Sequence, residues 1–344
     1  MTKKHTSDLH CHLNGSFSLK FLKKIAKKHN CLELYNALIR IRTEYLHNTN
    51  QQPENGYTKE LIDIIWKQFG LIHKIIQDLE DISEGVVDVV QCSEAKYLEI
   101  RTTPKEMANE SRDKYIDAFV SGLLQAREKI PNKKAVGLLS LDRTLHTVAD
   151  ANDFIEHILK SPNNVLVGLD ISGNPLAKRT LAGDELAQVI LLALKNGIAI
   201  AIHAGESDSE QERNDTDAIL TALEEWKLQQ PVQEKNPLHG KVRLGHCIYL
   251  TQLQKERINK LGLPIEVCPS CHSKLNWHLE KEPHPVTSIY QDVSDPIVPG
   301  TDDESIFGAS AKMELNRFLG FFSNKQQLSR KQIKEHQASF RFSM

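Results

Sequence analysis

The sequence has no long apolar segment, no excess of one charge and no dense group of cysteines. Its 344 residues contain no uninterrupted apolar run long enough to span a membrane. Its 43 Lys and Arg oppose 45 Asp and Glu, and the net charge of -2 excludes holding nucleic acid or an anionic membrane by bulk electrostatics. The six cysteines are scattered, and the start MTKKHTSD lacks the apolar stretch of a signal peptide. We therefore expect a cytoplasmic protein without a nucleic-acid or membrane partner.

The sequence also lacks an obvious linker between domains. No Pro/Gly/Ser-rich stretch or block of charge divides it, and the most linker-like segment, residues 47–58, falls within the first quarter. The hydrophobic share of 40% is enough for one large core. We expect a single domain over residues 1–344, and the sequence leaves its oligomeric state open.

What is present is a repeated alternation of short β-branched runs and helical patterns. The predicted strands are residues 8–13, 97–102, 135–142, 165–170, 198–206, 242–246, 264–268 and 296–303. The predicted helices between them include residues 19–29, 59–90, 114–129, 151–160, 185–196, 215–226 and 251–260. Such an α/β pattern favours a single (β/α)8 TIM barrel, with an open parallel sheet as the alternative. In a barrel the catalytic groups lie at the carboxyl ends of the strands.

The first predicted strand carries His10 and His12. Residues two apart on a strand point to the same face, so both imidazoles are expected at the barrel mouth. Two converging neutral imidazoles are half of a zinc site. A pair of this kind also arises by chance, so the motif alone leaves a decorative role open.

Two later strands end on further polar residues. His203 and Glu206 close the fifth strand, where Gly205 allows a sharp turn that brings the carboxyl group back over the site. Asp302 and Asp303 close the eighth strand. The alternatives are a solvated Glu206 and an aspartate that caps the next helix, which can explain only one of the pair.

Together, three histidines and one aspartate form a credible mononuclear zinc site: His10, His12, His203 and Asp302. A binuclear site would usually recruit a bridging lysine or carboxylate from the fourth strand, and that strand ends without a lysine. One zinc per chain is therefore predicted.

The motifs resemble those of the adenosine deaminase family of metal-dependent hydrolases. They are HCHLNGS at 10–16, GLDISGN at 168–174, HAGE at 203–206, GHC at 245–247, CPS at 268–270 and TDD at 301–303. The resemblance implies a (β/α)8 barrel with one zinc, held by the four residues named above. It further implies a hydrolase that uses a zinc-activated water to attack carbon 6 of an aminopurine and releases ammonia or an amine.

The resemblance also implies individual roles. Glu206 would give a proton to purine nitrogen 1, and His246 would orient the attacking water and accept its proton. Asp303 would hydrogen-bond nitrogen 7, the Gly173 amide would reach nitrogen 3, and His12 would also contact the substrate.

Within the family, the sequence is similar to the adenosine deaminase-like branch, which acts on N(6)-methyl-AMP. Nucleoside deaminases usually have Asp where Asn14 stands, and residues 96–104 and 139–143 also match the branch. The residues implied to line the ribose phosphate pocket are Asn14, His73, Thr102, Thr103, Lys105 and Asp142. We expect a purine nucleotide substrate. The alternatives are an adenosine deaminase, a deaminase of free adenine and a purine-binding barrel without turnover.

Two positions depart from the family pattern. Cys247 stands where the family usually has Gly, and Cys271 forms a Cys-x-x-Cys pair with Cys268. A redox or second metal motif is the alternative for this pair. We do not favour it, because no second such pair exists and no helix start is expected there.

Overall fold

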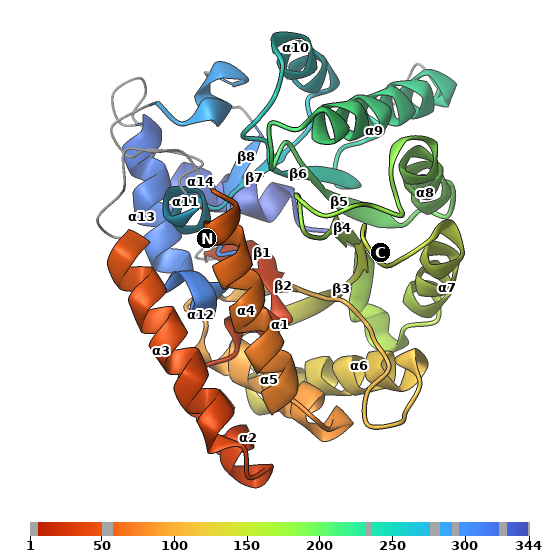
Figure 1. Ribbon diagram of the computed structural model, residues 1–344. Helices are drawn as coiled ribbons and strands as arrows, with labels where there is room; N and C mark the ends of the chain where they lie inside the picture. The colour runs from red at the N-terminus through yellow and green to blue at the C-terminus, as the bar shows by residue number, and fades with distance from the viewer. Residues whose placement is uncertain are drawn as a thin grey trace. The chain divides into compact units, whose positions relative to one another are not determined.

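The computed structural model describes residues 6–49, 58–231, 236–275, 283–290, 296–322 and 329–342. Eight strands form one sheet in chain order and alternate with helices (Figure 1), which confirms the predicted (β/α)8 fold class. The strands are β1 (Ser7–His12), β2 (Tyr97–Thr102), β3 (Lys134–Asp142), β4 (Leu166–Ser172), β5 (Ala199–Ala204), β6 (Val242–His246), β7 (Ile265–Val267) and β8 (Ile297–Pro299).

The α-helices in the first half of the chain are α1 (Leu13–Ser16), α2 (Leu19–Lys28), α3 (Leu32–Thr49), α4 (Lys59–Ile75), α5 (Leu79–Cys92), α6 (Arg112–Lys129) and α7 (Val148–Leu159). Those in the second half are α8 (Gly183–Lys195), α9 (Glu210–Gln229), α10 (Gln252–Leu261), α11 (Pro269–Lys274), α12 (Glu304–Phe307), α13 (Ala311–Phe322) and α14 (Arg330–Ser339). Short 3-10 turns cover Pro162–Asn164 and Pro285–Ser288.

The described residues cluster in two compact units. The first unit comprises those of Met1–Gly137, Cys268–Glu282 and Pro299–Phe318. The second comprises those of Leu138–Val267, Pro283–Val298 and Leu319–Met344. Each unit is assembled from separate stretches of sequence, so the single domain over residues 1–344 stays a prediction.

In the first unit, β1 pairs in parallel with β2, and His12 lies opposite Arg101. The segment after β8 runs beside β1: His12 N donates to Asp302 O at 2.8 Å, and Asp302 N donates to His10 O at 2.8 Å. These hydrogen bonds bring the first and last motifs of the chain together, although almost 300 residues of sequence separate them.

In the second unit, β4, β5, β6 and β7 lie side by side in parallel (Figure 1). Every residue of β5 is buried, as its continuous apolar run predicts for a strand covered on both faces. The register places His203 opposite Gly245 and Ala204 opposite His246. The ends of β5 and β6 therefore present their polar residues at the same edge.

The predicted helix over residues 59–90 is wrong, because the structure has two helices there. The backbone of Ile76 is extended, and Asp78 and Asp81 form a capping box that starts α5. The helix α3 was not predicted, and it occupies the first three residues of the linker-like segment 47–58. Residues 50–57 of that segment lie outside the described residues.

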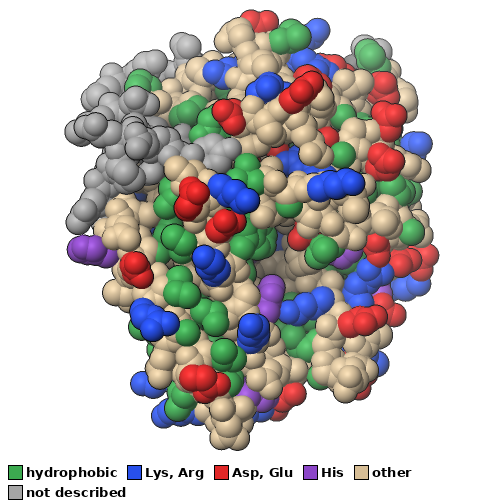
Figure 2. Space-filling view, viewed as in Figure 1, with side chains coloured by type: hydrophobic (Ala, Val, Ile, Leu, Met, Phe, Trp, Pro, Cys, Tyr) green, Lys and Arg blue, Asp and Glu red, His purple; other side chains and the backbone are tan. Residues whose placement is uncertain are grey.

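On the face in Figure 2, the coloured Lys and Arg side chains are interspersed with Asp and Glu. This distribution agrees with the near-neutral charge of the sequence. In the described part of the chain, no helix is both long enough and apolar enough to cross a membrane.

Candidate active site

The first unit holds three predicted zinc ligands in one cluster. His10 Nε2 lies 3.4 Å and His12 Nε2 lies 3.5 Å from the same oxygen, Oδ1 of Asp302. His10 is fully buried, and Asp302 is 6% exposed. Ligands of a tetrahedral zinc, each about 2.0–2.2 Å from the metal, lie about 3.3–3.6 Å from one another. The spacing and the donor types of this cluster therefore fit zinc.

The backbone around Asp302 is held in a conformation that non-glycine residues seldom adopt. Its φ is 61°, in the left-handed region. Asp8 supports this turn, because its carboxylate accepts hydrogen bonds from Thr301 Oγ1 at 2.6 Å and from His10 N at 3.2 Å. Burial raises the pKa of Asp8 to about 6, although these hydrogen bonds act in the opposite direction. Sequence reasoning missed Asp8, which lies on the predicted first strand.

Asp303 is buried beside this cluster. Burial and the neighbouring charge of Asp302 raise its pKa well above its ordinary value. A Cβ atom on Gly15 would lie 1.8 Å from Asp303 Oδ1, so the glycine of the first motif leaves room for this carboxyl group. Asp303 occupies the N-cap position of α12, but its side chain forms no capping hydrogen bond. Helix capping therefore does not explain it.

Several residues expected around a ribose phosphate also meet in the first unit. Asn14 Nδ2 lies 3.1 Å from His73 Nε2, and the Thr102 hydroxyl lies 2.7 Å from that of Tyr115. Tyr115 also hydrogen-bonds the Asn14 side chain, and burial raises its pKa to about 12. Tyr115 was missed, because on the apolar face of α6 it is indistinguishable in sequence from an ordinary core residue.

Lys105 adds a positive charge to this group. Partial burial of the His73 ring and the charge of Lys105 lower the pKa of His73 below its ordinary value. Burial also lowers the pKa of Lys105. No carboxylate in the described parts of the chain forms an ion pair with Lys105. Thr103, also predicted here, is half-buried immediately after β2.

The second unit brings together His203, Glu206 and His246. The two imidazole rings lie 4.9 Å apart, between centroids. Glu206 Oε1 is 3.6 Å from His246 Nε2, and Glu206 Oε2 is 3.7 Å from His203 Nδ1. His203 Nε2 also lies 3.6 Å from Asp170 Oδ1, at the end of β4. All four side chains are buried, so Glu206 is not the solvated residue of the alternative interpretation.

Two sharp turns shape this group. Gly205 has a φ of 66°, and it ends β5 before Glu206. His246, the last residue of β6, and Cys247, which follows it, have φ values of 64° and 57°. Cys247, where the family usually has Gly, thus adopts the left-handed conformation that glycine favours. Its thiol is buried, and burial raises its pKa.

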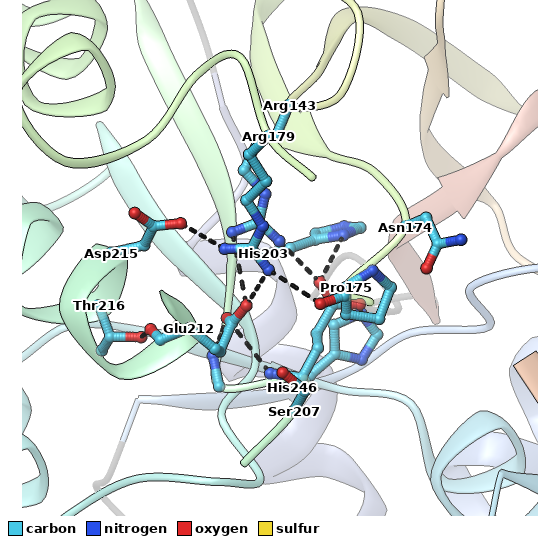
Figure 3. A network of polar contacts seen from close by, with 12 residues as sticks. Arg143, Asn174, Pro175, Arg179, His203, Ser207, Glu212, Asp215, Thr216 and His246 are labelled. Carbon is cyan, nitrogen blue, oxygen red and sulfur yellow. Dashed lines mark hydrogen bonds and ion pairs between the residues drawn. The ribbon is translucent and has the colours of Figure 1, made fainter. Parts of the chain in front are cut away.

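Figure 3 shows a buried network of charges around Arg143, Arg179 and Glu212 that sequence reasoning missed. Arg143 Nη2 donates to Glu206 Oε2 at 3.1 Å, and Arg179 donates to both Glu212 and Asp215. Burial acts to raise the pKa of Glu212, but Arg143 and Arg179 outweigh it and hold the pKa below its ordinary value. A sequence signal existed for Arg143 alone, which follows Asp142 in a motif of the family branch.

Asp142 and Gly173, two predicted substrate contacts, are adjacent in the second unit. A Cβ on Gly173 would lie 2.6 Å from Asp142 Oδ1. The φ of Gly173 is 133°, which also disfavours other residues. Asp142 Oδ1 accepts hydrogen bonds from Thr144 N at 2.8 Å and Thr144 Oγ1 at 2.7 Å, so the carboxylate is held in place.

The expectation that no helix starts near the Cys-x-x-Cys pair is wrong. Cys268 is the N-cap of α11, and Pro269 is its first residue. Pro at this position suits a helix start, and that signal was available in the sequence. Both thiols are buried, and burial raises the pKa of Cys271 well above its ordinary value. Reactive thiols have lowered pKa values, so the pair does not have the environment of a redox motif.

Parallel strands that alternate with helices and end on histidines and carboxylates are typical of (β/α)8-barrel enzymes. The family model for adenosine deaminase matches residues 6–341, and the chain belongs to this family. The resemblance inferred from the motifs is thereby confirmed.

Individual relatives agree with this assignment. The chain is 25% identical over 319 residues to N6-Methyl-AMP deaminase-L of Xenopus laevis, covering 89% of this chain and 80% of that protein. A solved structure of Arabidopsis ADAL complexed with GMP matches with a TM-score of 0.76 at 20% identity, covering 98% of this chain and 92% of the other. An amidohydrolase from Burkholderia ambifaria with bound Zn matches with a TM-score of 0.68 at 14% identity, covering 98% and 86%. The structural matches support the barrel fold.

Proposed function

We propose that this protein is a zinc-dependent hydrolase that removes the 6-amino or 6-alkylamino group from a purine nucleoside monophosphate such as N(6)-methyl-AMP. Family membership supports the deamination reaction. The residues around Lys105 are the observation that favours a nucleotide over a nucleoside as the substrate. A cation with a lowered pKa and no carboxylate partner in the described structure is a suitable partner for an anionic ligand.

The neighbours of Lys105 are also suited to a phosphate. Asn14 is neutral and offers an amide donor, whereas a carboxylate at this position would repel a phosphate group. The hydroxyl groups of Thr102 and Thr103 are further candidate donors. The names of the relatives agree, because one is an N6-methyl-AMP deaminase and another was solved with GMP.

We further propose that His10, His12, His203 and Asp302 bind one zinc ion. Asp302 Oδ1 lies 3.4 Å from His10 Nε2 and 3.5 Å from His12 Nε2, and this spacing supports the ligand set. When bound, the metal would supply an activated water for addition to carbon 6 of the purine.

The remaining site residues would orient the ring and move protons. Glu206 would give a proton to ring nitrogen 1, and His246 would orient the water and accept its proton. Asp303 would hydrogen-bond nitrogen 7, and the Gly173 amide would bond nitrogen 3. Asp142, beside Gly173, would contact the ribose phosphate.

We also propose that the protein works in the cytoplasm. All six cysteines are free thiols, and five of them are buried. This usage agrees with a reducing compartment.

The test is a comparison of kcat/KM for N(6)-methyl-AMP, AMP, adenosine and adenine, using zinc-loaded protein and detecting the released ammonia or methylamine. We expect a monophosphate to be the best of these substrates. A higher efficiency with adenosine would make the protein an adenosine deaminase, the alternative that the family name favours. A preference for adenine would overturn the nucleotide assignment. Binding of purines without release of any amine would indicate a non-catalytic barrel.

A further inference from the structure

Glu206 is held at two separate points in the second unit. Glu212 Oε1 accepts hydrogen bonds from Gly205 N at 2.7 Å and from Glu206 N at 3.4 Å, which fixes the backbone of the turn. Arg143 Nη2 donates to the Glu206 carboxylate at 3.1 Å. The orientation of the carboxyl group thus depends on a side chain from the segment after β3.

The backbone of Arg143 is held by hydrogen bonds on both sides of the residue. Its backbone N donates to Ser172 O at 2.8 Å, and its carbonyl oxygen accepts from Thr180 N at 2.7 Å and Leu181 N at 3.1 Å. Its side chain is only 1% exposed. These hydrogen bonds fix the backbone of Arg143, and burial restricts the conformations open to its side chain.

The charges around Arg143 leave little freedom for substitution. Arg179 pairs with Glu212 and Asp215, whereas Arg143 pairs with Glu206 and places Nη1 3.9 Å from Glu212 Oε2. One planar guanidinium thus faces two carboxylates through two nitrogens. A lysine ammonium is a single point of charge on a flexible chain and does not reproduce this arrangement.

We propose that Arg143 is a positioning residue that aligns the Glu206 carboxyl group for proton transfer to the purine ring. This inference rests on the proposed deamination. A proton donor must lie within hydrogen-bond reach of its acceptor, and a displacement of about 1 Å can cost about 100-fold in rate. Arg143 acts through Glu206 and does not itself take part in the proton transfer.

The first experiment measures kcat and KM of the zinc-loaded Arg143→Lys protein with the best monophosphate substrate. We expect kcat to fall about 10- to 100-fold, while KM stays within about 3-fold. Arg257→Lys is the matched control, because Arg257 forms an ion pair with Glu224 at 2.8 Å between α9 and α10. The control should keep the kcat of the unsubstituted protein. Thermal unfolding checks both proteins, and Arg143→Gln replaces the first variant if Arg143→Lys does not fold.

The second experiment is a double-mutant cycle with Glu206→Gln. If Arg143 acts through the Glu206 carboxyl group, adding Arg143→Lys to Glu206→Gln should lower kcat by no more than about 2-fold. A purely structural role for Arg143 predicts instead that the two losses multiply, and that result would overturn the proposal.

The outcomes also separate this inference from the proposed function. If the unsubstituted protein releases no ammonia or amine from any aminopurine, the proposed function fails and the inference fails with it. If it is active and Arg143→Lys behaves like Arg257→Lys, the inference alone is wrong.

Discussion

Asn14→Asp should shift the substrate preference from nucleotide toward nucleoside. The substitution keeps the size of the side chain and places a carboxylate about where Asn14 Nδ2 lies, 3.1 Å from His73 Nε2. If the substrate phosphate binds in this group, two negative charges roughly 4 Å apart at an effective dielectric of about 20 repel by about 4 kcal/mol. Without any screening, this repulsion would lower the affinity for the monophosphate about 1,000-fold.

Two features of the site reduce this figure. The neighbouring Lys105 offsets part of the added charge, and the His73 ring can take up a proton beside a carboxylate. Salt in the solvent screens the remainder. We therefore expect a remaining repulsion of about 1.5–2.7 kcal/mol, which is a roughly 10- to 100-fold fall in kcat/KM for the monophosphate relative to adenosine.

The assay is the ratio of kcat/KM for N(6)-methyl-AMP or AMP to that for adenosine, measured with the same protein preparation. Asn14→Ala is the control, because it removes the amide without adding charge and should move this ratio much less. Lys105→Met should also lower the ratio, by removing the cation while sparing adenosine. An unchanged ratio in Asn14→Asp, or an equal shift in Asn14→Ala, would refute the reasoning.

Three further predictions concern metal, proton transfer and pH. Purified protein should contain about one zinc per chain by elemental analysis, and His10→Ala or Asp302→Ala should lose it; two metals per chain, or full activity with none, would contradict the mononuclear site. Glu206→Gln should lower turnover about 100- to 10,000-fold with zinc still bound, and near-normal ammonia release would exclude Glu206 as the proton donor. Burial raises the pKa of Glu314 from its ordinary value of 4.5 to about 7, although hydrogen bonds from Ser270 act in the opposite direction. The contribution of Glu314 to the free energy of unfolding is thus fully present below about pH 4.5 and is lost as the pH rises through 7. Urea denaturation should therefore show that the unsubstituted protein loses stability between pH 5 and pH 8. Glu314→Gln should lose less, by up to about 3 kcal/mol. An equal loss in both proteins would count against this assignment.

The sequence was most informative where structure depends on neighbouring residues. The bounds predicted for β2 and β6 agree with the structure, although buried Glu99, Arg101 and Arg243 interrupt the apolar residues of these strands. The end of α4 was missed, although Asp78 and Asp81 provided a local capping signal. Helix α3 was harder to predict, because its apolar residues lie among many polar ones.

The motifs also identified groups within each unit. The His10 and His12 pair follows from the two-residue period of a strand, and Gly205 marks the turn that ends β5 before Glu206. Asp302 entered the predicted zinc site because it ends the eighth predicted strand, and the family pattern agreed with that choice. The spacing of these residues along the chain could not by itself show that Asp302 runs beside β1.

The sequence by itself thus determined the alternation of strands and helices, the family, and the residues at the strand ends. The tertiary structure alone decided which polar groups meet behind them: Arg143 with Glu206, Tyr115 with Thr102, and Asp8 with Thr301. Secondary structure is set by interactions over a few residues, so its pattern is written locally in the sequence. A buried polar side chain instead takes its partner from whichever segment the folded chain brings within about 3 Å, and that choice depends on the path of the whole backbone.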